Sequence, residues 1–271
     1  MKMKKMLVGM LGAAMLLAMV GCGGNDKKAE APKKAEPAQK IVIGLDDNFA
    51  PMGFRDKDNK IVGLDIDLAR EACKRANLNP EFKPIDWGAK EAEIKSKRID
   101  AIWNCFTVNP EREKVYGLSK PYLNNAQMIV VRKGDNIKDK AGLAGKIVGV
   151  QDDSTGDYIL TQRDKALGAS LKKLNKYADF PAAYLDLDNK RIDCIIVDAV
   201  LAYDTNKKQP GKYEVMPTPL ADEVVAVAFR KDDKELIAKV DKALDEMKKD
   251  GTAKKICEQW LGADMIKYEK K

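Results

Sequence analysis

The chain has 271 residues, of which 34% are charged, carries a formal net charge of +7 and contains no histidine. The absence of histidine excludes a Ser-His-Asp or Cys-His catalytic apparatus and any zinc site with histidine ligands. Hydrophobic residues at 45% and aromatic residues at 6% are values typical of a globular protein, and the length suffices for one large domain or two ordinary ones.

The N-terminal segment has the pattern of a secretory signal. Three lysines within the first five residues precede the apolar run 6–20, which is too short to span a membrane as a helix. The run ends at Gly21 and Cys22, which resemble the bacterial lipoprotein box, whose cysteine is lipidated. We therefore predict a signal peptide at 1–21, and a lipidated Cys22 with a flexible tether at 22–40. A plain secretory signal with an incidental cysteine is the alternative.

Most of the net charge lies in this segment. Residues 1–40 hold eight lysines and three acidic residues, whereas the remaining 231 residues carry 41 basic and 39 acidic groups, a net charge of +2. Nucleic acid, which a strongly basic protein would favour as a partner, is therefore not expected.

Four cysteines follow the tether: Cys73, Cys105, Cys194 and Cys257. Their spacing does not define a pairing, and the sequence contains no C-x-x-C motif. We predict free, buried thiols and no metal site.

Apolar runs of strand length alternate with segments of helical periodicity from residue 41 onward, which predicts an α/β fold with mostly parallel strands. The predicted strands are 41–45, 81–85, 99–103, 146–150, 193–197 and 222–230, and the predicted helices are 65–77, 89–97, 155–165, 180–187, 233–249 and 252–260.

One hexapeptide is nearly repeated. Residues 97–102 read KRIDAI and residues 190–195 read KRIDCI. In both places the basic end of a helix turns into a buried strand. The repeat indicates two similar lobes with a cleft between them, and ligands of such sheets gather beyond the carboxyl ends of the strands.

The residues that follow the predicted strands supply carboxylates, an arginine, hydroxyls at a helix start and an aromatic ring. A zwitterion needs this set, because its carboxylate is recognised by a guanidinium and helix N-terminal amides and its ammonium by a carboxylate. The candidates in chain order are Asp46, Phe49, Asn104, Cys105, Thr107, Arg112, Gln151, Ser154, Thr155 and Asp198.

An ordered series of motifs carries a family resemblance. It comprises FAP at 49–51, GLDIDLA at 63–69, RIDAI at 98–102, TVNPER at 107–112, SKPY at 119–122 and KIVGVQ at 146–151. The series resembles the polar amino-acid-binding branch (family 3) of the extracellular solute-binding proteins of bacterial ABC importers, over residues 41–262. The resemblance implies a two-lobed periplasmic-binding-protein-like fold, in which each lobe is a mostly parallel sheet flanked by helices. Lobe 1 comprises 41–128 plus 221–271 and lobe 2 comprises 129–220, with two hinge strands near 127–131 and 217–222.

The resemblance also implies roles at the two charged ends of a ligand. Arg112 would grip the α-carboxylate, aided by the hydroxyls and amides of Ser154 and Thr155. Asp198 would take the α-ammonium, with Thr107 beside it. These residues would bring the two lobes together around the ligand.

The side chain of the ligand is implied to lie between Phe49 and Trp87. Aromatic faces of this kind stack well on a cationic or amide group. Asp46 would point at the end of the side chain, and Gln151 sits where selectivity is often tuned. Glutamine, arginine, lysine, histidine and cystine all stay open as ligands.

Several positions have other interpretations. The backbone near Asn104 is implied to complete the ammonium cradle, but the family often has Ser or Gly at the positions of Asn104 and Cys105. Arg112 could instead belong to a solvated charged face, and Asp198 could merely cap the following helix. Trp87 could be an ordinary core or rim aromatic residue.

The function implied is capture of a polar or charged amino acid by hinge closure and its delivery to a membrane permease. We expect an extracytoplasmic, lipid-anchored monomer that needs no cofactor or metal and is not an enzyme. A cyclohexadienyl-dehydratase-like enzyme, with Asp46, Asp47 or Lys90 as general acid, is one alternative. A sensory or adhesive surface lipoprotein is another.

Overall fold

The computed structural model describes residues 37–268. The predicted signal peptide, Cys22 and most of the predicted tether lie outside the described residues. Within residues 37–268, no helix combines the length and the apolar character needed to cross a membrane.

The described strands form one large sheet of mixed direction. Its central path has the order β10-β9-β11-β8-β13-β6-β1-β5, and the short strands β12 and β7 pair with β8 and β13. The bounds are β1 (Gln39–Leu45), β5 (Leu78–Pro84), β6 (Ala101–Thr107), β7 (Tyr116–Leu118), β8 (Leu123–Arg132), β9 (Ile147–Gln151), β10 (Lys173–Tyr177), β11 (Cys194–Asp198), β12 (Tyr213–Val215) and β13 (Ala221–Arg230). A separate small antiparallel sheet consists of β2 (Asn48–Phe49), β3 (Gly53–Arg55) and β4 (Ile61–Val62).

Strand direction divides the sheet into two parallel groups. β1 pairs in parallel with β5 and β6, and β9 pairs in parallel with β10 and β11. Between them, β8 pairs antiparallel with both β11 and β13. The predicted α/β architecture with mostly parallel strands is confirmed.

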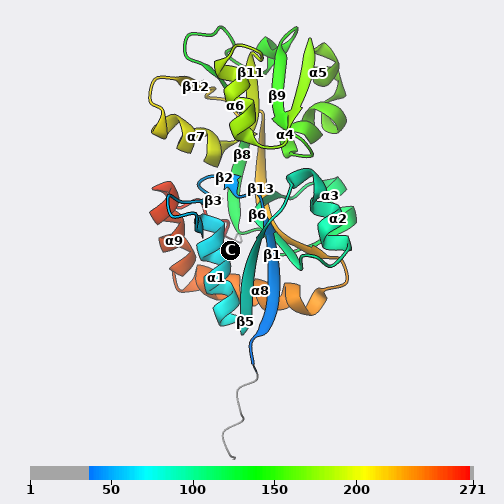
Figure 1. Cartoon of the computed structure of the whole chain (residues 1–271), viewed down its shortest axis with the longest axis vertical. Helices are drawn as coiled ribbons and strands as arrows, with labels where there is room; N and C mark the ends of the chain where they lie inside the picture. Colours follow the sequence, from blue (N-terminus) through cyan, green and yellow to red (C-terminus); the bar gives the residue numbers. More distant parts are fainter. Residues whose placement is uncertain (1–36, 269–271) are drawn as a thin grey trace, which may run out of the picture. The chain divides into compact units, whose positions relative to one another are not determined.

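Helices cover both parallel groups (Figure 1). Their bounds are α1 (Leu64–Arg75), α2 (Lys90–Lys95), α3 (Pro110–Val115), α4 (Thr155–Tyr158), α5 (Lys165–Ser170), α6 (Phe180–Asp188), α7 (Ala199–Lys208), α8 (Lys234–Lys249) and α9 (Thr252–Leu261), with single turns η1 (Trp87–Ala89), η2 (Lys140–Leu143) and η3 (Ile159–Arg163). α1 contacts both α8 and α9, so the C-terminal helices pack beside the first part of the chain.

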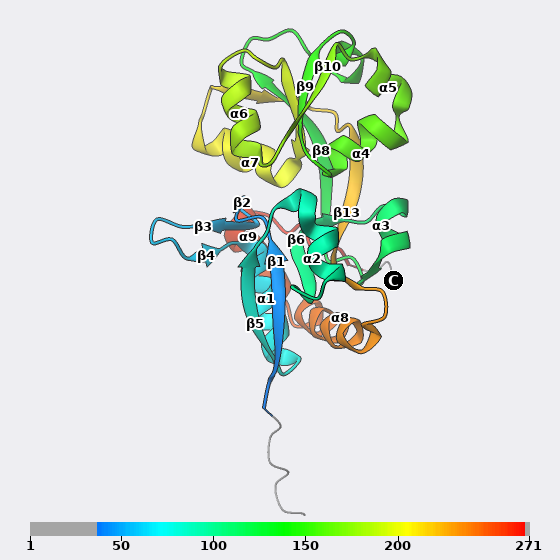
Figure 2. The same ribbon diagram turned by 45° about the vertical axis from the view of Figure 1, so that its right-hand side comes forward.

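The two long strands β8 and β13 connect the parallel groups. β8 pairs with β13 over residues 123–127 and with β11 over residues 127–131. Figure 2 shows both strands running between the group that holds β1, β5 and α1 and the group that holds β9, β10 and α6. The predicted hinge segment 127–131 lies within β8, whereas of the predicted segment 217–222 only residues 221 and 222 belong to a strand. The exact lobe boundaries stay a prediction.

Several predicted boundaries were wrong, and three of them concern the tether or the elements around the site. β1 begins at Gln39, so the tether ends two residues earlier than expected. β6 continues to Thr107 rather than ending at residue 103, and a register shift against β13 accommodates Cys105, whose φ is 48°. The segment 155–165 is not one helix, because the Asp164 side chain accepts a hydrogen bond from the Leu167 amide and starts α5 as a new helix.

The repeated hexapeptide has the same structural role in both groups. The Asp100 carboxylate accepts a hydrogen bond from the Val42 amide at 2.9 Å, and the Asp193 carboxylate accepts one from the Ile147 amide at 2.7 Å. Each aspartate amide in turn donates to the carbonyl of the same partner. Each aspartate thus fixes the start of one parallel strand to the next, which supports two lobes built on one plan.

The prediction of free, buried thiols is confirmed, because Cys73, Cys105, Cys194 and Cys257 are all unpaired and buried.

Replacing Asp193 by alanine tests this role of the repeat. We expect the free energy of unfolding to fall by about 1–3 kcal/mol, because the Ile147 amide loses its acceptor. Urea unfolding measures the change, with Asp58→Ala at an exposed turn as the control. Equal stability of the two variants would contradict the role assigned to Asp193.

Candidate ligand-binding site

Ten of the eleven predicted site residues line one cavity. They are Phe49, Trp87, Asn104, Cys105, Thr107, Arg112, Gln151, Ser154, Thr155 and Asp198. The eleventh, Asp46, accepts a hydrogen bond from the Gln151 side chain at 2.7 Å. The fold therefore brings the whole predicted set together from residues that lie as far as 152 positions apart, between Asp46 and Asp198.

Arg112 is held in the cavity wall by the start of α3. The Asn109 side chain caps this helix by accepting the Arg112 amide at 2.8 Å, and Arg112 is only 8% exposed. Its guanidinium donates to the carbonyls of Thr107 at 3.0 Å and Asp153 at 3.3 Å, and it lies 4.3 Å from the Phe106 ring centroid. Among the described residues it forms no ion pair with a carboxylate, and burial lowers its pKa. It is therefore not part of a solvated charged face.

Asp198 ends β11 directly before α7 and is buried. Its side chain does not cap α7, which sets aside the capping interpretation. Instead it accepts a hydrogen bond from the Asn125 amide group at 2.7 Å, and the Cys105 thiol lies 3.8 Å away. Burial raises the pKa of Asp198, and Asp198 forms no ion pair among the described residues.

Ser154 and Thr155 lie where α4 begins. The Ser154 hydroxyl accepts a hydrogen bond from the Asp157 amide at 3.2 Å, and Thr155 is the first helical residue. Both are buried and both line the cavity. Ser154 and Thr155 thus begin the helix and line the cavity at the same time.

Two aromatic side chains line the cavity from separate elements. Phe49 of β2 is buried and packs on Phe180 with ring centroids 5.7 Å apart. Trp87 in η1 is 6% exposed and is positioned by Asp86, which accepts the Gly88 amide. Both rings therefore belong to the core and to the cavity at once.

Hydrogen bonds link the polar residues Asp46, Asn104 and Gln151 to each other. Gln151 donates through its side-chain amide to Asp46 and to the Ala178 carbonyl, and burial raises the pKa of Asp46. The Asn104 side-chain oxygen accepts the Asp46 amide at 2.9 Å, but its buried nitrogen has no hydrogen-bond partner among the described residues. Since a buried donor without an acceptor is costly, this nitrogen is available to a bound group.

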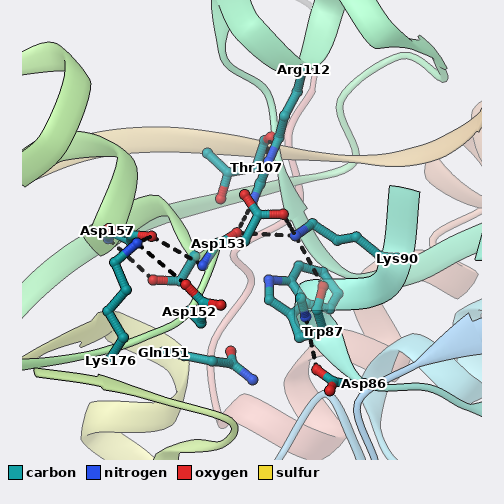
Figure 3. Close-up of polar contacts among 12 residues, drawn as sticks. Asp86, Trp87, Lys90, Thr107, Arg112, Gln151, Asp152, Asp153, Asp157 and Lys176 are labelled. Atoms are coloured by element: carbon teal, nitrogen blue, oxygen red, sulfur yellow. Dashed lines mark hydrogen bonds and ion pairs between the residues drawn. The ribbon is translucent and has the colours of Figure 1, made fainter. Parts of the chain in front are cut away.

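A buried lysine beside the cavity was not among the predicted ligand-binding residues. Lys90 of α2 is 1% exposed, and its ammonium donates to the carbonyls of Trp87 and Asp153 and forms an ion pair with the Asp153 carboxylate. Figure 3 shows Lys90 and Arg112 both directed at Asp153. The signal was its spacing, because Lys90 lies three residues after Trp87 and four before the buried Ile94.

Two further residues near Asp198 were also missed. Asn125 of β8 donates both to Asp198 and to Glu223 of β13, the latter at 2.5 Å. Nothing in the local sequence marks them, because only the pairing of β8 with β11 and β13 brings them together.

Asp65 supports the cavity from behind. It is fully buried, accepts the Cys105 amide at 2.7 Å and accepts the Tyr122 hydroxyl at 2.6 Å. Burial raises its pKa to about 7. It thereby holds the backbone of β6 at the irregular position of Cys105.

Replacing Lys90 by methionine tests the electrostatic cost of its burial. Burial, together with the nearby Arg112 charge, lowers the pKa of Lys90 to about 8. Between this value and the ordinary pKa of 10.5, the unfolded chain binds more protons at Lys90 than the folded chain does. The free energy of unfolding therefore rises with pH in this range, and the cost of burying Lys90 falls. We expect Lys90→Met to raise the free energy of unfolding at pH 7 by up to about 4 kcal/mol, an advantage that shrinks as the pH rises from 8 to 10.

Urea unfolding across this pH range measures the difference, and Lys95→Met, at an exposed position of the same helix, is the control. An advantage of Lys90→Met that stays constant with pH would show that the Lys90 ammonium is not destabilised by burial.

Comparison with known proteins shows to which family this chain belongs. The family model described as bacterial extracellular solute-binding proteins, family 3, matches residues 41–263. The chain is 33% identical to the L-cystine-binding protein TcyJ of Escherichia coli strain K12, over 84% of each chain. It is 30% identical to the arginine-binding extracellular protein ArtP of Bacillus subtilis strain 168, over 96% of this chain and 98% of ArtP.

Solved structures of amino-acid-binding proteins have the same fold as this chain. A substrate-binding protein of an ABC uptake transporter from Streptococcus pneumoniae with bound histidine superposes with a TM-score of 0.81 at 34% identity, covering 84% of this chain and 95% of that one. An ancestral arginine-binding protein bound to arginine superposes with a TM-score of 0.78 at 36% identity, covering 84% and 100%. The chain belongs to family 3 of the bacterial extracellular solute-binding proteins.

Proposed function

We propose that this protein captures a polar or charged α-amino acid in the cavity and delivers it to the membrane permease of an ABC importer. The observation that carries the proposal is one cavity lined by a buried guanidinium, Arg112, and a buried carboxylate, Asp198, neither of which is in an ion pair among the described residues. A zwitterion supplies the missing partner to each.

The carboxylate of the ligand has a defined place in this proposal. Arg112 offers a planar fork of donors that matches a carboxylate, and the Ser154 and Thr155 hydroxyls lie on the same cavity. The ammonium lies toward Asp198 and the Thr107 side chain. Phe49 and Trp87 then flank the ligand side chain, whose end faces Asp46 and Gln151.

The relatives support this class of ligand. Their names record binding of cystine, arginine and histidine, and structural neighbours hold arginine, glutamine or histidine. Two aromatic rings and the Asp46 carboxylate suit a cationic or amide side chain. Cystine, glutamine, arginine, lysine and histidine stay open for this chain.

Binding is coupled to closure in this proposal. Arg112, Phe49 and Trp87 come from the chain around β1 and β6, whereas Ser154, Thr155 and Asp198 come from the chain around β9 and β11. A ligand that contacts both sets stabilises the closed arrangement specifically. β8 and β13 serve as the two hinge strands.

Binding rather than catalysis is favoured by how the candidate acids are engaged. Lys90 is held by Asp153 and by two carbonyls, and Asp46 by Gln151 and the Asn48 amide. We propose that the protein is not an enzyme and acts as a monomer.

Replacing Arg112 by alanine tests the proposal. We expect the affinity for the preferred amino acid to fall by about 2–5 kcal/mol, because a carboxylate would then be buried without its cationic partner. This corresponds to a roughly 30- to 5,000-fold rise in Kd. Titration calorimetry measures it.

The matched control is Arg98→Ala, whose side chain is 57% exposed and pairs with Glu93 outside the cavity. Circular dichroism checks that both variants are folded. Nearly normal affinity in folded Arg112→Ala would refute the carboxylate assignment.

We further propose that Cys22 is lipidated and anchors the domain outside the cytoplasmic membrane, in keeping with an extracellular family. Replacing Cys22 by serine is expected to abolish incorporation of a labelled fatty acid and to move the protein from the membrane to the soluble extracytoplasmic fraction. Cys73→Ser, a buried position, serves as the control. Unchanged membrane retention and labelling in Cys22→Ser would contradict the anchor.

A further inference from the structure

Two carboxyl groups, those of buried Asp198 and half-buried Glu223, lie on one face of the strand β8. Within the sheet, β8 is flanked by β11 and β13, and the register sets Gln127 opposite Asp198 and Asn125 opposite Glu223. Because side chains two residues apart on a strand share a face, all four side chains project to the same side. The sheet itself thus brings Asp198 and Glu223 together.

The hydrogen bonds confirm this placement. The Asn125 side-chain amide donates to the Asp198 carboxyl at 2.7 Å and to the Glu223 carboxyl at 2.5 Å. The Gln127 side-chain amide also donates to Glu223, at 3.0 Å. The second carboxyl oxygen of Glu223 is buried and has no hydrogen-bond partner among the described residues.

The groups around this pair do not neutralise it. Cys105 and Thr107 of β6 face it with a thiol and a hydroxyl, and Asn125 and Gln127 of β8 face it with amides. The cation that acts on Asp198 is Arg112, and it makes no ion pair with either carboxylate. Burial, and for Glu223 also the charge of Asp198, raise the pKa of both groups. Two adjacent carboxylates without a paired cation resist ionising together, which favours one proton shared between them.

We propose that Glu223 is a second binding residue for the ligand ammonium: in the empty protein it shares one proton with Asp198, and the incoming ammonium replaces that proton, which leaves to solvent. This inference rests on the proposed function, since it requires an amine ligand at Asp198. The ammonium has three N–H donors, whereas the shared proton forms only one bridge between the two carboxyl groups. The unpartnered oxygen of Glu223 then gains a donor.

The consequence is binding coupled to proton release. About one proton is released per ligand bound, so Kd falls about tenfold for each unit of pH while the empty pair holds its proton. Replacing Glu223 by glutamine removes the shared proton but keeps the side-chain length. Glu223→Gln is therefore expected to bind without releasing a proton and with little pH dependence.

The experiment is titration calorimetry at pH 6 in buffers of different ionisation enthalpy, which yields the number of protons released. L-arginine, L-glutamine and L-cystine are the probes, because none of their side chains changes charge near this pH. Lys90, whose pKa is about 8, keeps its proton there. Asp222→Asn, at the exposed neighbouring position, is the matched control and is expected to behave as the wild type does.

The outcomes separate this inference from the proposed function. Binding of a probe with release of about one proton by the wild type, and of none by Glu223→Gln, supports the inference. Binding without proton release, or equal release by both proteins, overturns it and leaves the proposed function standing. No binding of any probe or other amino acid overturns both.

A measurement on the wild-type protein alone tests the inference even if the Glu223→Gln variant does not fold. Infrared difference spectra upon ligand addition are expected to show the loss of a protonated carboxyl band. An unchanged intensity of protonated carboxyl absorption between the empty and the ligand-saturated protein would overturn the inference.

Discussion

The site depends on a guanidinium that is buried without a carboxylate. Removing a charge from water is expensive unless it is paired, and Arg112 is compensated only by two carbonyls and the ring of Phe106. Asp198 is in the complementary situation, since it accepts a hydrogen bond from the Asn125 amide and forms no ion pair among the described residues. Each group is thus held ready for an opposite charge, and among the described residues the two do not pair with each other.

The sheet topology places the two groups on separate elements. β6 and α3 carry Thr107 and Arg112, whereas β11 ends at Asp198, and the antiparallel strands β8 and β13 lie between β6 and β11. The same central strands supply Asn125 and Glu223 to the carboxyl pair. A change in how β8 and β13 bend would therefore alter the cavity and the charges inside it together.

Much of this arrangement could be predicted from the sequence, because it depends on local patterns. Apolar runs located the strands, and the KRID repeat located equivalent strand starts that Asp100 and Asp193 indeed fix. The extent of β6 could not be predicted, since its last residues are polar and are placed by tertiary contacts: Thr107 pairs with Val225 of β13, and the Asn104 side chain accepts the Asp46 amide. Lys90 and Glu223 were missed for a related reason: a charged residue on a helix or strand is normally solvated, and only tertiary contacts bury Lys90 and bring Glu223 to Asn125.

The most direct test of the account is a thermal-shift comparison of the intact wild-type domain with amino acids and with analogues that lack one charge. Arginine, glutamine, histidine, lysine and cystine would each be set beside the matching deaminated and decarboxylated compounds. The account predicts that at least one amino acid raises the melting temperature, by the equivalent of about 2.7 kcal/mol at a hundredfold excess over Kd, and that neither of its analogues does. Equal stabilisation by an analogue that lacks the carboxylate or the ammonium would contradict recognition of a zwitterion by Arg112 and Asp198.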